Sequence, residues 1–282
     1  MTSRTVVELI RARPASDGAG VKLLRVFGGQ RAALFDPFLM LDEFGSESAD
    51  DYIGGFPPHP HRGFETITYM LQGKMEHQDH MGNIGLLNDG DVQWMTAAHG
   101  IIHSEMPKQT AGKMRGFQLW LNLAADKKMQ PAAWRDLPAQ EVPSFEWEGV
   151  HVKALAGRAR VNGQAVLGYF ERPDTQPVYL DVHLAPGAAA QLELEANLNA
   201  LVYSYDGEVA VAGTAVPSQT LARLTPEGLL ELTNTSTSIS RCLVLAGVPL
   251  KQPIVQHGPF VMNTQQEIEQ AIRDYHAGVL AV

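Results

Sequence analysis

The sequence has little cysteine, no excess of basic charge and no long apolar run, and each shortage excludes a class of protein. Cys242 is the only cysteine among 282 residues, so no internal disulfide can form and a reducing compartment is expected. It lies in the strand-like run SRCLVLAG, where we expect a buried, inert thiol. The 22 lysines and arginines are outnumbered by 31 aspartates and glutamates. This balance argues against direct binding of nucleic acid.

Segments that would place the chain in or across a membrane are also missing. No apolar run approaches the roughly 20 residues that a membrane-spanning helix needs. The first twenty residues, MTSRTVVELIRARPASDGAG, lack the apolar core and cleavage site of a signal peptide. A hydrophobic share of 45% is typical of a globular protein rather than a disordered one. We therefore expect a folded cytoplasmic protein without a membrane partner.

Long helical patterns are absent from most of the chain, and short strand-like runs take their place. Glycine, proline, asparagine and aspartate separate these runs. In GFQLWLNLA, Phe117, Leu119 and Leu121 alternate with other residues at the period of two that a half-buried strand requires. Regular short strands of this kind predict an all-β sandwich or barrel.

The chain reads as two similar β domains. Residues 126–148 are rich in charge, proline and alanine, which predicts a linker between a domain at 1–125 and a domain at 149–282. TITYMLQGKM, from Thr66, aligns with ALVYSYDGEV, from Ala200, as expected for a repeat. At the same offset, the pair His59 and His61 falls on two glutamates, Glu193 and Glu195. The second domain therefore lacks these histidines.

One helix is predicted at the C-terminus. Thr264 and Glu267 have the spacing of a capping box. An apolar face follows, and Gly278 ends the pattern. The face is formed by Ile268, Ala271, Ile272 and Tyr275. We expect this helix to pack against a barrel.

Two histidine-containing pairs are candidates for a metal site. His59 and His61 are two residues apart, and His103 and Glu105 repeat the spacing about forty residues later. Residues i and i+2 of a strand project to the same side, so each pair can direct both side chains to one point. One such pair of residues by itself is usually only a polar feature at the rim of a sheet. Two pairs in one β domain favour a site of three imidazoles and one carboxylate.

This donor set leaves the metal open. The absence of thiolate disfavours a closed structural zinc site. Iron(II) fits, and so do manganese, nickel, copper and catalytic zinc. Among the other histidines, His99 is a candidate hydrogen-bond partner of His103. His77 and His80 are expected to be solvated or to be outer hydrogen-bond partners of the ligands.

These residues resemble a known family. The runs PFLMLDEF, HPHRGFETITYMLQG, GDVQWMTAAHGIIHSEMP and HGPFVMNT, the last followed by the helix, are similar to those of the pirin family of the cupin superfamily. The resemblance implies two cupin barrels of the double-stranded β-helix type, with one metal ion, usually iron, in the N-terminal barrel. It implies four ligands: His59, His61, His103 and Glu105.

The sequence departs from related patterns at two positions. The general cupin pattern would make Glu65 a ligand, whereas in pirins the later glutamate takes that role, so Glu65 is the reserve candidate. His99 stands where many pirins are expected to have an arginine.

The resemblance also implies an activity. Some pirins are quercetinases, which use dioxygen to cleave the ring of quercetin-type flavonols. A flavonol or another small aromatic substrate is then expected, with Glu105 as both ligand and base. Met75, Trp94 and Phe117 are candidate cavity residues, although core packing is the favoured role for each. The alternative is an iron-dependent regulatory protein that binds a protein partner without turnover. We expect a monomer in either case.

Overall fold

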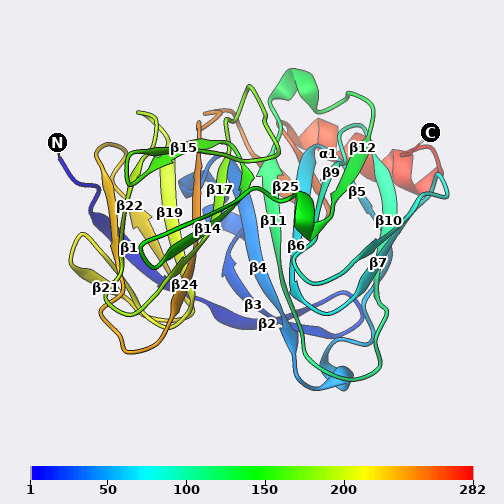
Figure 1. Cartoon of the computed structure of the whole chain (residues 1–282). Helices are drawn as coiled ribbons and strands as arrows, with labels where there is room; N and C mark the ends of the chain where they lie inside the picture. The colour runs from blue at the N-terminus through cyan, green and yellow to red at the C-terminus, as the bar shows by residue number, and fades with distance from the viewer. Residues whose placement is uncertain (1, 282) are drawn as a thin grey trace. The chain divides into compact units, whose positions relative to one another are not determined.

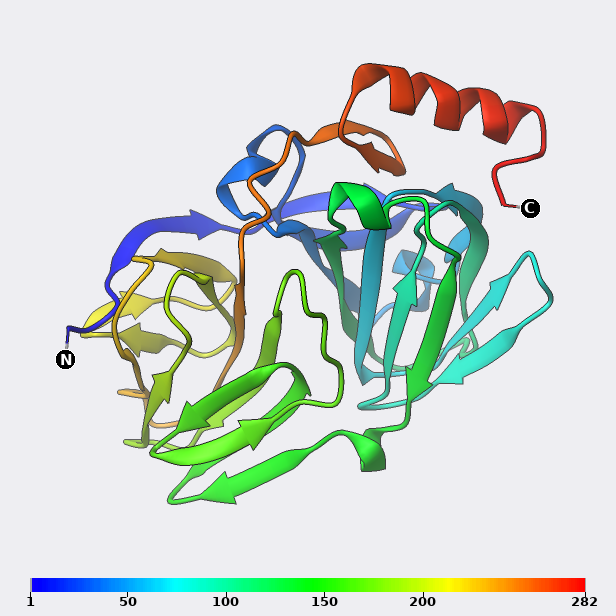
Figure 2. The ribbon, with the colours of Figure 1, turned by 90° about the horizontal axis from the view of Figure 1, so that it is seen from above.

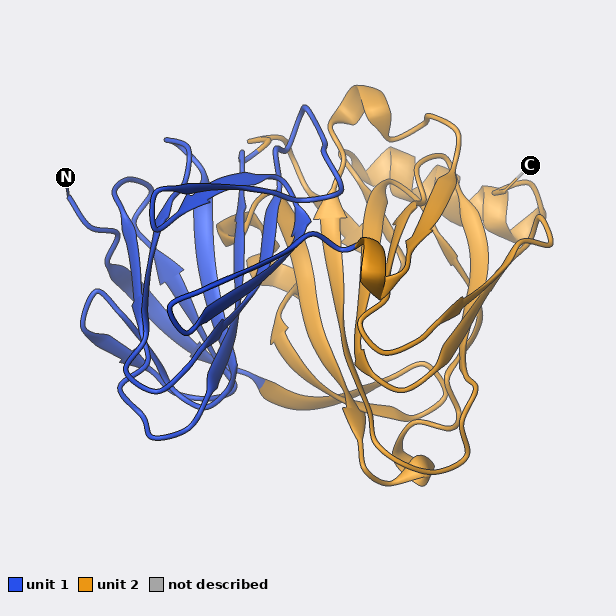
Figure 3. Cartoon of the chain, in the orientation of Figure 1, with its two compact units in different colours: residues 1–12, 142–249 blue, residues 13–141, 250–282 orange. Residues whose placement is uncertain are grey.

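The computed structural model describes residues 2 to 281, and its regular secondary structure consists mainly of β-strands (Figure 1). It separates into two compact units (Figure 3). The first barrel comprises Arg13–Glu141 and the residues from Leu250 onward, and the second comprises the segment up to Ala12 and Val142–Pro249. No helix among the described residues has both the length and the apolar character needed to cross a membrane.

The units differ from the expected boundaries at both ends of the chain. β1 (Val6–Arg11) pairs with β22 (Thr220–Leu224) and so belongs to the second barrel, whereas the C-terminal segment joins the first. The expected linker 126–148 contains two strands, β12 (Ala133–Leu137) and β13 (Ser144–Trp147). Each of them pairs with a strand outside the linker. Composition does not reveal the pairings of β1 and β12, because their partners are distant in sequence, whereas β13 pairs with the segment that directly follows it.

The first barrel consists of a seven-stranded and a four-stranded sheet. The larger sheet has the order β12-β9-β6-β11-β4-β3-β2 and the smaller β5-β10-β7-β8. Apolar residues of both sheets, including Leu23, Phe44, Met70 and Met75, share one core. The strands are β2 (Arg13–Asp17), β3 (Val21–Phe27), β4 (Phe38–Ser46), β5 (Phe56–His61), β6 (Phe64–Gln72), β7 (Met75–Asp79), β8 (Ile84–Leu87), β9 (Val92–Thr96), β10 (Ile101–Pro107) and β11 (Met114–Asn122).

The second barrel repeats this arrangement. Its larger sheet has the order β1-β22-β19-β24-β17-β14-β13, so β19 takes the place that β6 has in the first barrel. Its smaller sheet has the order β16-β15-β18-β23-β20-β21. The strands not yet given are β14 (Val150–Ala156), β15 (Arg158–Val161), β16 (Gln164–Leu167), β17 (Val178–Leu184), β18 (Ala189–Glu193), β19 (Asn199–Asp206), β20 (Val209–Val211), β21 (Thr214–Val216), β23 (Leu230–Thr233) and β24 (Ser240–Gly247).

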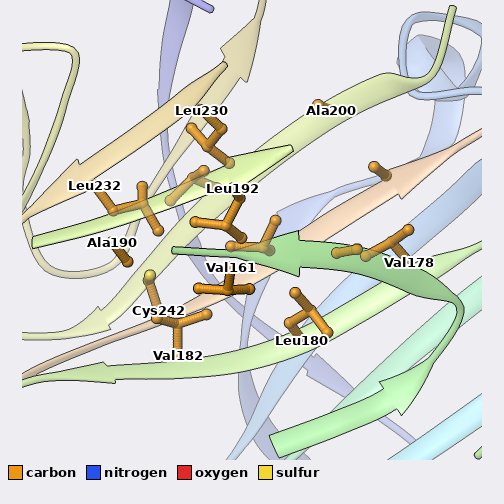
Figure 4. Packing of buried hydrophobic residues seen from close by; sticks show 14 of the residues in the cluster. Val161, Val178, Leu180, Val182, Ala190, Leu192, Ala200, Leu230, Leu232 and Cys242 are labelled. Atoms are coloured by element: carbon orange, nitrogen blue, oxygen red, sulfur yellow. The ribbon is translucent and has the colours of Figure 1, made fainter. Parts of the chain in front are cut away.

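Small and branched apolar side chains fill the second barrel. Val161, Val182, Leu192 and Leu232 are fully buried and pack together (Figure 4). Cys242 lies in the same core as a free thiol, whose pKa is raised by burial. Glu193, at the position that matches His59, is exposed at the end of β18.

The C-terminal helix α1 (Gln265–His276) forms as the sequence predicts. Thr264 and Glu267 make both bonds of the capping box, and Ile268 and Ala271 are buried. The apolar cluster around them includes residues of β26 (Phe260–Met262), which pairs with β25 (Val255–His257). Figure 2 shows these strands and α1 as one continuous segment, coloured orange to red, which belongs to the first barrel. Short 3₁₀-helices span Gly29–Leu34, Ala49–Asp51, Ala125–Lys127 and Ala139–Glu141.

Candidate metal centre

Three histidine side chains converge inside the first barrel. His59 and His61 end β5, and His103 lies on β10, which pairs with β5 in the antiparallel sense. His103 and His59 are direct partners in this pairing. One ring nitrogen from each of the three histidines lies within 4.8 Å of the others. Strand pairing therefore brings together residues that are about forty positions apart.

Backbone carbonyl groups determine how two of these rings are protonated. Nδ1 of His59 lies 2.8 Å from the oxygen of Pro57, and Nδ1 of His61 lies 3.4 Å from that of Pro259. Because a carbonyl oxygen only accepts hydrogen bonds, Nδ1 carries the hydrogen in both rings and Nε2 has the lone pair. The two Nε2 atoms are 3.1 Å apart. Facing lone pairs at this distance repel each other unless a cation lies between them.

His103 is oriented by another histidine. Its Nδ1 lies 2.7 Å from Nε2 of His77, and its Nε2 is buried without a hydrogen-bond partner among the described residues. An unpaired buried nitrogen is costly, and a metal ion would satisfy it. All three Nε2 atoms thus have the arrangement of histidine ligands whose other nitrogen is held by an outer partner.

His77 is fully buried on β7 and bonds to one of the three converging histidines. Of the two positions expected from the sequence, solvated or an outer hydrogen-bond partner of a ligand, the second is correct. The spacing of two between His77 and each of Met75 and Asp79, both buried, was the available signal. The expected role of His99 beside His103 was wrong, because His77 occupies that place. The backbone of His99 bonds instead to Gln130 and to the side chain of Arg62.

Burial keeps the imidazoles neutral. It lowers the pKa of His61 and of His103 well below the usual range, and the neighbouring histidines lower it further. Burial also lowers the pKa of His77 to about 4. Neutral imidazole is the form that binds a metal ion. The site is therefore prepared for a cation at neutral pH.

Glu105 lies two residues beyond His103 on β10 and is buried. Its carboxylate accepts hydrogen bonds from Oγ1 of Thr68 at 3.0 Å and from Nε2 of Gln118 at 3.2 Å. Burial raises its pKa. Within the described residues, Glu105 lies outside the group of ligand atoms that are all within 4.8 Å of one another. Glu65, the reserve candidate, is buried and accepts a 2.5 Å hydrogen bond from Thr96.

The C-terminal segment supports His61 from outside. Arg62, the next residue, is buried and pairs with Asp274 of α1 at 2.6 Å. Its guanidinium also donates to the carbonyl of Leu280, and its own carbonyl accepts from Val261. Together with the Pro259 carbonyl, these bonds tie the strand carrying His61 to the last thirty residues of the chain.

A cavity of about 570 Å³ adjoins the histidines. His59, His61 and Glu105 line it, and Trp120 packs edge-on against the His61 ring with ring centres 5.3 Å apart. Of the three candidate cavity residues, Met75 lines this space, whereas Trp94 and Phe117 are buried but do not. Its other side chains are mixed, with apolar Leu23, Met40, Phe44, Phe56 and Trp120 beside polar Asp17, Arg25, Asp42, Gln118 and Gln256.

The fold agrees with comparisons to known proteins. The family model "Pirin" matches residues 20–121, and the model "Pirin C-terminal cupin domain" matches residues 179–281. The chain belongs to the pirin family. The resemblance inferred from the motifs is therefore confirmed, as is the predicted all-β fold of two cupin domains with a short C-terminal helix.

Relatives cover the whole length of the chain. A Pseudomonas aeruginosa protein named "Putative quercetin 2,3-dioxygenase" is 55% identical over 283 residues, covering 99% of each chain. Human pirin is 37% identical, covering 97% of this chain and 93% of its own. A crystal structure of quercetin 2,3-dioxygenase from Acinetobacter baumannii superposes with a TM-score of 0.90 at 30% identity, covering 99% of each chain.

Three imidazoles without a thiolate suit a single divalent ion of the first transition series. Such a site keeps positions open for other ligands, since the histidines occupy only three. The buried carboxyl of Glu105, whose pKa is raised by burial, lines the adjoining cavity.

Proposed function

We propose that this protein is an iron(II)-dependent dioxygenase that cleaves the ring of quercetin-type flavonols. The observation that carries the proposal is the convergence of three Nε2 lone pairs beside a cavity that a buried carboxyl group also lines. The Pseudomonas aeruginosa relative, which is named "Putative quercetin 2,3-dioxygenase", supports the same activity.

Four side chains would hold the ion. His59, His61 and His103 would bind through Nε2, and Glu105 would complete the set through one carboxylate oxygen. A bound divalent iron supplies Lewis acidity toward the oxygens of the substrate and redox chemistry with dioxygen. Manganese, nickel, copper and zinc remain alternatives for the same donor set.

Glu105 would also move a proton. Its pKa is raised by burial, which brings the carboxyl closer to the range where it can both accept and return a proton at neutral pH. It would take the proton of the substrate hydroxyl next to the ring that is cleaved. Thr68 and Gln118 hold the carboxyl in place from two neighbouring strands.

The cavity walls would bind and orient the aromatic rings. Phe44, Phe56 and Trp120 line the cavity with aromatic surface, which favours the offset or edge-on packing of a planar ligand. Their burial of apolar area also excludes water from the reacting atoms.

Oxygen uptake tests this proposal. Protein loaded with iron(II) under anaerobic conditions is mixed with quercetin and dioxygen, and the loss of both is followed together. We expect stoichiometric consumption, loss of bound metal in His61→Ala, and slower turnover in Glu105→Gln, which keeps partners for Thr68 and Gln118. If iron-loaded protein consumes no dioxygen with any flavonol, the assignment is wrong.

A further inference from the structure

A row of polar side chains crosses the larger sheet of the first barrel. In the strand register, Arg25 of β3 pairs with Asp42 of β4, Asp42 pairs with Gln118 of β11, and Gln118 pairs with Thr68 of β6. Directly paired residues lie on the same face of a sheet. Arg25, Asp42 and Gln118 all line the cavity, so the row runs along one of its walls.

The two ends of this row lie at different distances from Glu105. Thr68 and Gln118 bond to Glu105, whereas Arg25 lies two strands beyond Gln118. Neighbouring strands are about 4.8 Å apart, which separates the backbones of Arg25 and Gln118 by about 10 Å. Arg25 and Glu105 therefore line different parts of the cavity.

Arg25 is held firmly but keeps donors free. Its Nε and Nη2 donate to the two oxygens of Asp42 at 2.9 and 2.8 Å, and Nη2 also reaches Asp17 at 3.3 Å. Asp42 is buried, so this two-bond pairing fixes the guanidinium plane. Nη1 makes no hydrogen bond to any residue from 2 to 281. Its two N–H groups are therefore available to a ligand.

The charge of this wall disfavours an acidic ligand. Asp42 balances the guanidinium, and Asp17 adds a second carboxylate to the lining. The hydrogen bonds that Arg25 donates to Asp42 raise the pKa of Arg25, so the side chain stays charged throughout the physiological range. A free N–H donor thus stands next to a carboxylate acceptor. This combination suits a neutral group that both accepts and donates, such as two neighbouring hydroxyls on an aromatic ring.

We propose that Arg25 and Asp17 recognise the hydroxylated ring of the aromatic substrate at the end remote from the metal. Nη1 of Arg25 donates to one hydroxyl oxygen, and Asp17 accepts from the neighbouring hydroxyl. Asp42 is a positioning residue that holds Arg25. The inference rests on the proposed function, because it concerns the substrate of the same cavity, and it assigns the residues that distinguish flavonols by the hydroxyls of their pendant ring.

Binding without turnover tests this assignment. Protein loaded with redox-inactive zinc is titrated anaerobically with quercetin, which has two neighbouring hydroxyls on its pendant ring, and with the flavonol whose pendant ring is unsubstituted. Quenching of tryptophan fluorescence reports binding, since Trp120 lines the cavity. The variants are Arg25→Met, Arg25→Lys and Asp42→Asn. Lys22→Met is the control. This substitution also removes one positive charge from β3, but the side chain of Lys22 is 69% exposed.

Loss of a hydrogen bond to a charged group predicts that Arg25→Met weakens quercetin binding by about 10- to 100-fold. Arg25→Lys and Asp42→Asn should weaken it less, because each keeps a positive charge at this wall. Binding of the unsubstituted flavonol should stay within about twofold in every variant, which also shows that the cavity remains folded.

Three results would overturn the inference. Equal losses for both ligands in Arg25→Met would assign Arg25 a structural role, and unchanged quercetin affinity would remove it from recognition. In either case, quercetin turnover by the iron-loaded wild-type protein would leave the proposed function standing. If neither flavonol binds the wild-type protein, the inference and the proposed function both fail.

Discussion

The hydrogen bond between His77 and His103 offers a direct test of how the metal centre is built. Both rings are buried, and the bond is 2.7 Å long. Replacing His77 by phenylalanine keeps a ring beside Trp134, whose centre lies 4.9 Å away, but removes the only partner of His103 Nδ1 described here. Loss of such an outer partner costs about 10- to 100-fold in metal affinity, or about 1.4 to 2.7 kcal/mol.

The measurement is a metal titration of the metal-free protein against a competing chelator. We expect His77→Phe to weaken binding by that factor and His77→Gln to recover part of the loss, because a glutamine oxygen can accept from Nδ1–H. His80→Phe is the matched control. His80 is exposed, and its only side-chain bond among the described residues is a long one, 3.4 Å, from the backbone of Ile102.

The reasoning is refuted if folded His77→Phe protein binds metal as tightly as the wild type. An equal loss in His80→Phe would also count against it, because the effect would then not come from the bond to His103. Circular dichroism of each metal-free variant separates a loss of affinity from a loss of fold.

Three further predictions concern stability. Asp274→Ala leaves the buried Arg62 guanidinium without its carboxylate, which should lower the free energy of unfolding by about 3 kcal/mol in urea denaturation. Burial lowers the pKa of Lys128 to about 7. The unfolded chain therefore binds more protons between about pH 7 and 10, and stability relative to Lys128→Met should rise there by up to about 1.4 kcal/mol per pH unit. Burial also lowers the pKa of His61 and His103, so acidification below about pH 6.5 should destabilise the metal-free protein.

Each of these results has its own control. Asp126→Ala removes an exposed carboxylate and should change the free energy of unfolding by less than about 0.5 kcal/mol. If it lowers stability as much as Asp274→Ala does, the loss in Asp274→Ala does not come from the ion pair with Arg62. Identical alkaline slopes for the wild type and Lys128→Met would show that Lys128 titrates normally. A His61→Phe, His103→Phe double variant that is as acid-sensitive as the wild type would exclude these histidines as the cause.

Much of the metal centre follows from local patterns. His59 and His61, like His103 and Glu105, are spaced so that strand alternation alone directs each pair to one side. The capping box of Thr264 and Glu267 likewise depends on neighbours three residues apart, so the helix could be predicted without knowing the fold.

Strand alternation also could have identified His77, but not its partner. Nothing within MEHQD indicates that β7 would pair with β10 and place His77 against His103. The same holds for Arg25, whose role in the cavity depends on the register of β3 against β4. Register between strands is set by the whole barrel and its shared core.

The sequence alone thus determines which side chains of a strand project to the same side, and where the last helix begins. Only the tertiary structure decided which strands pair. It pairs β5 with β10 and β1 with a strand of the second barrel, and it places the C-terminal segment against the strand carrying His61. The physical reason is the range of the forces involved. Alternation and capping arise from bonds between near neighbours, whereas pairing is selected by burial and hydrogen bonding between segments separated by tens to hundreds of residues.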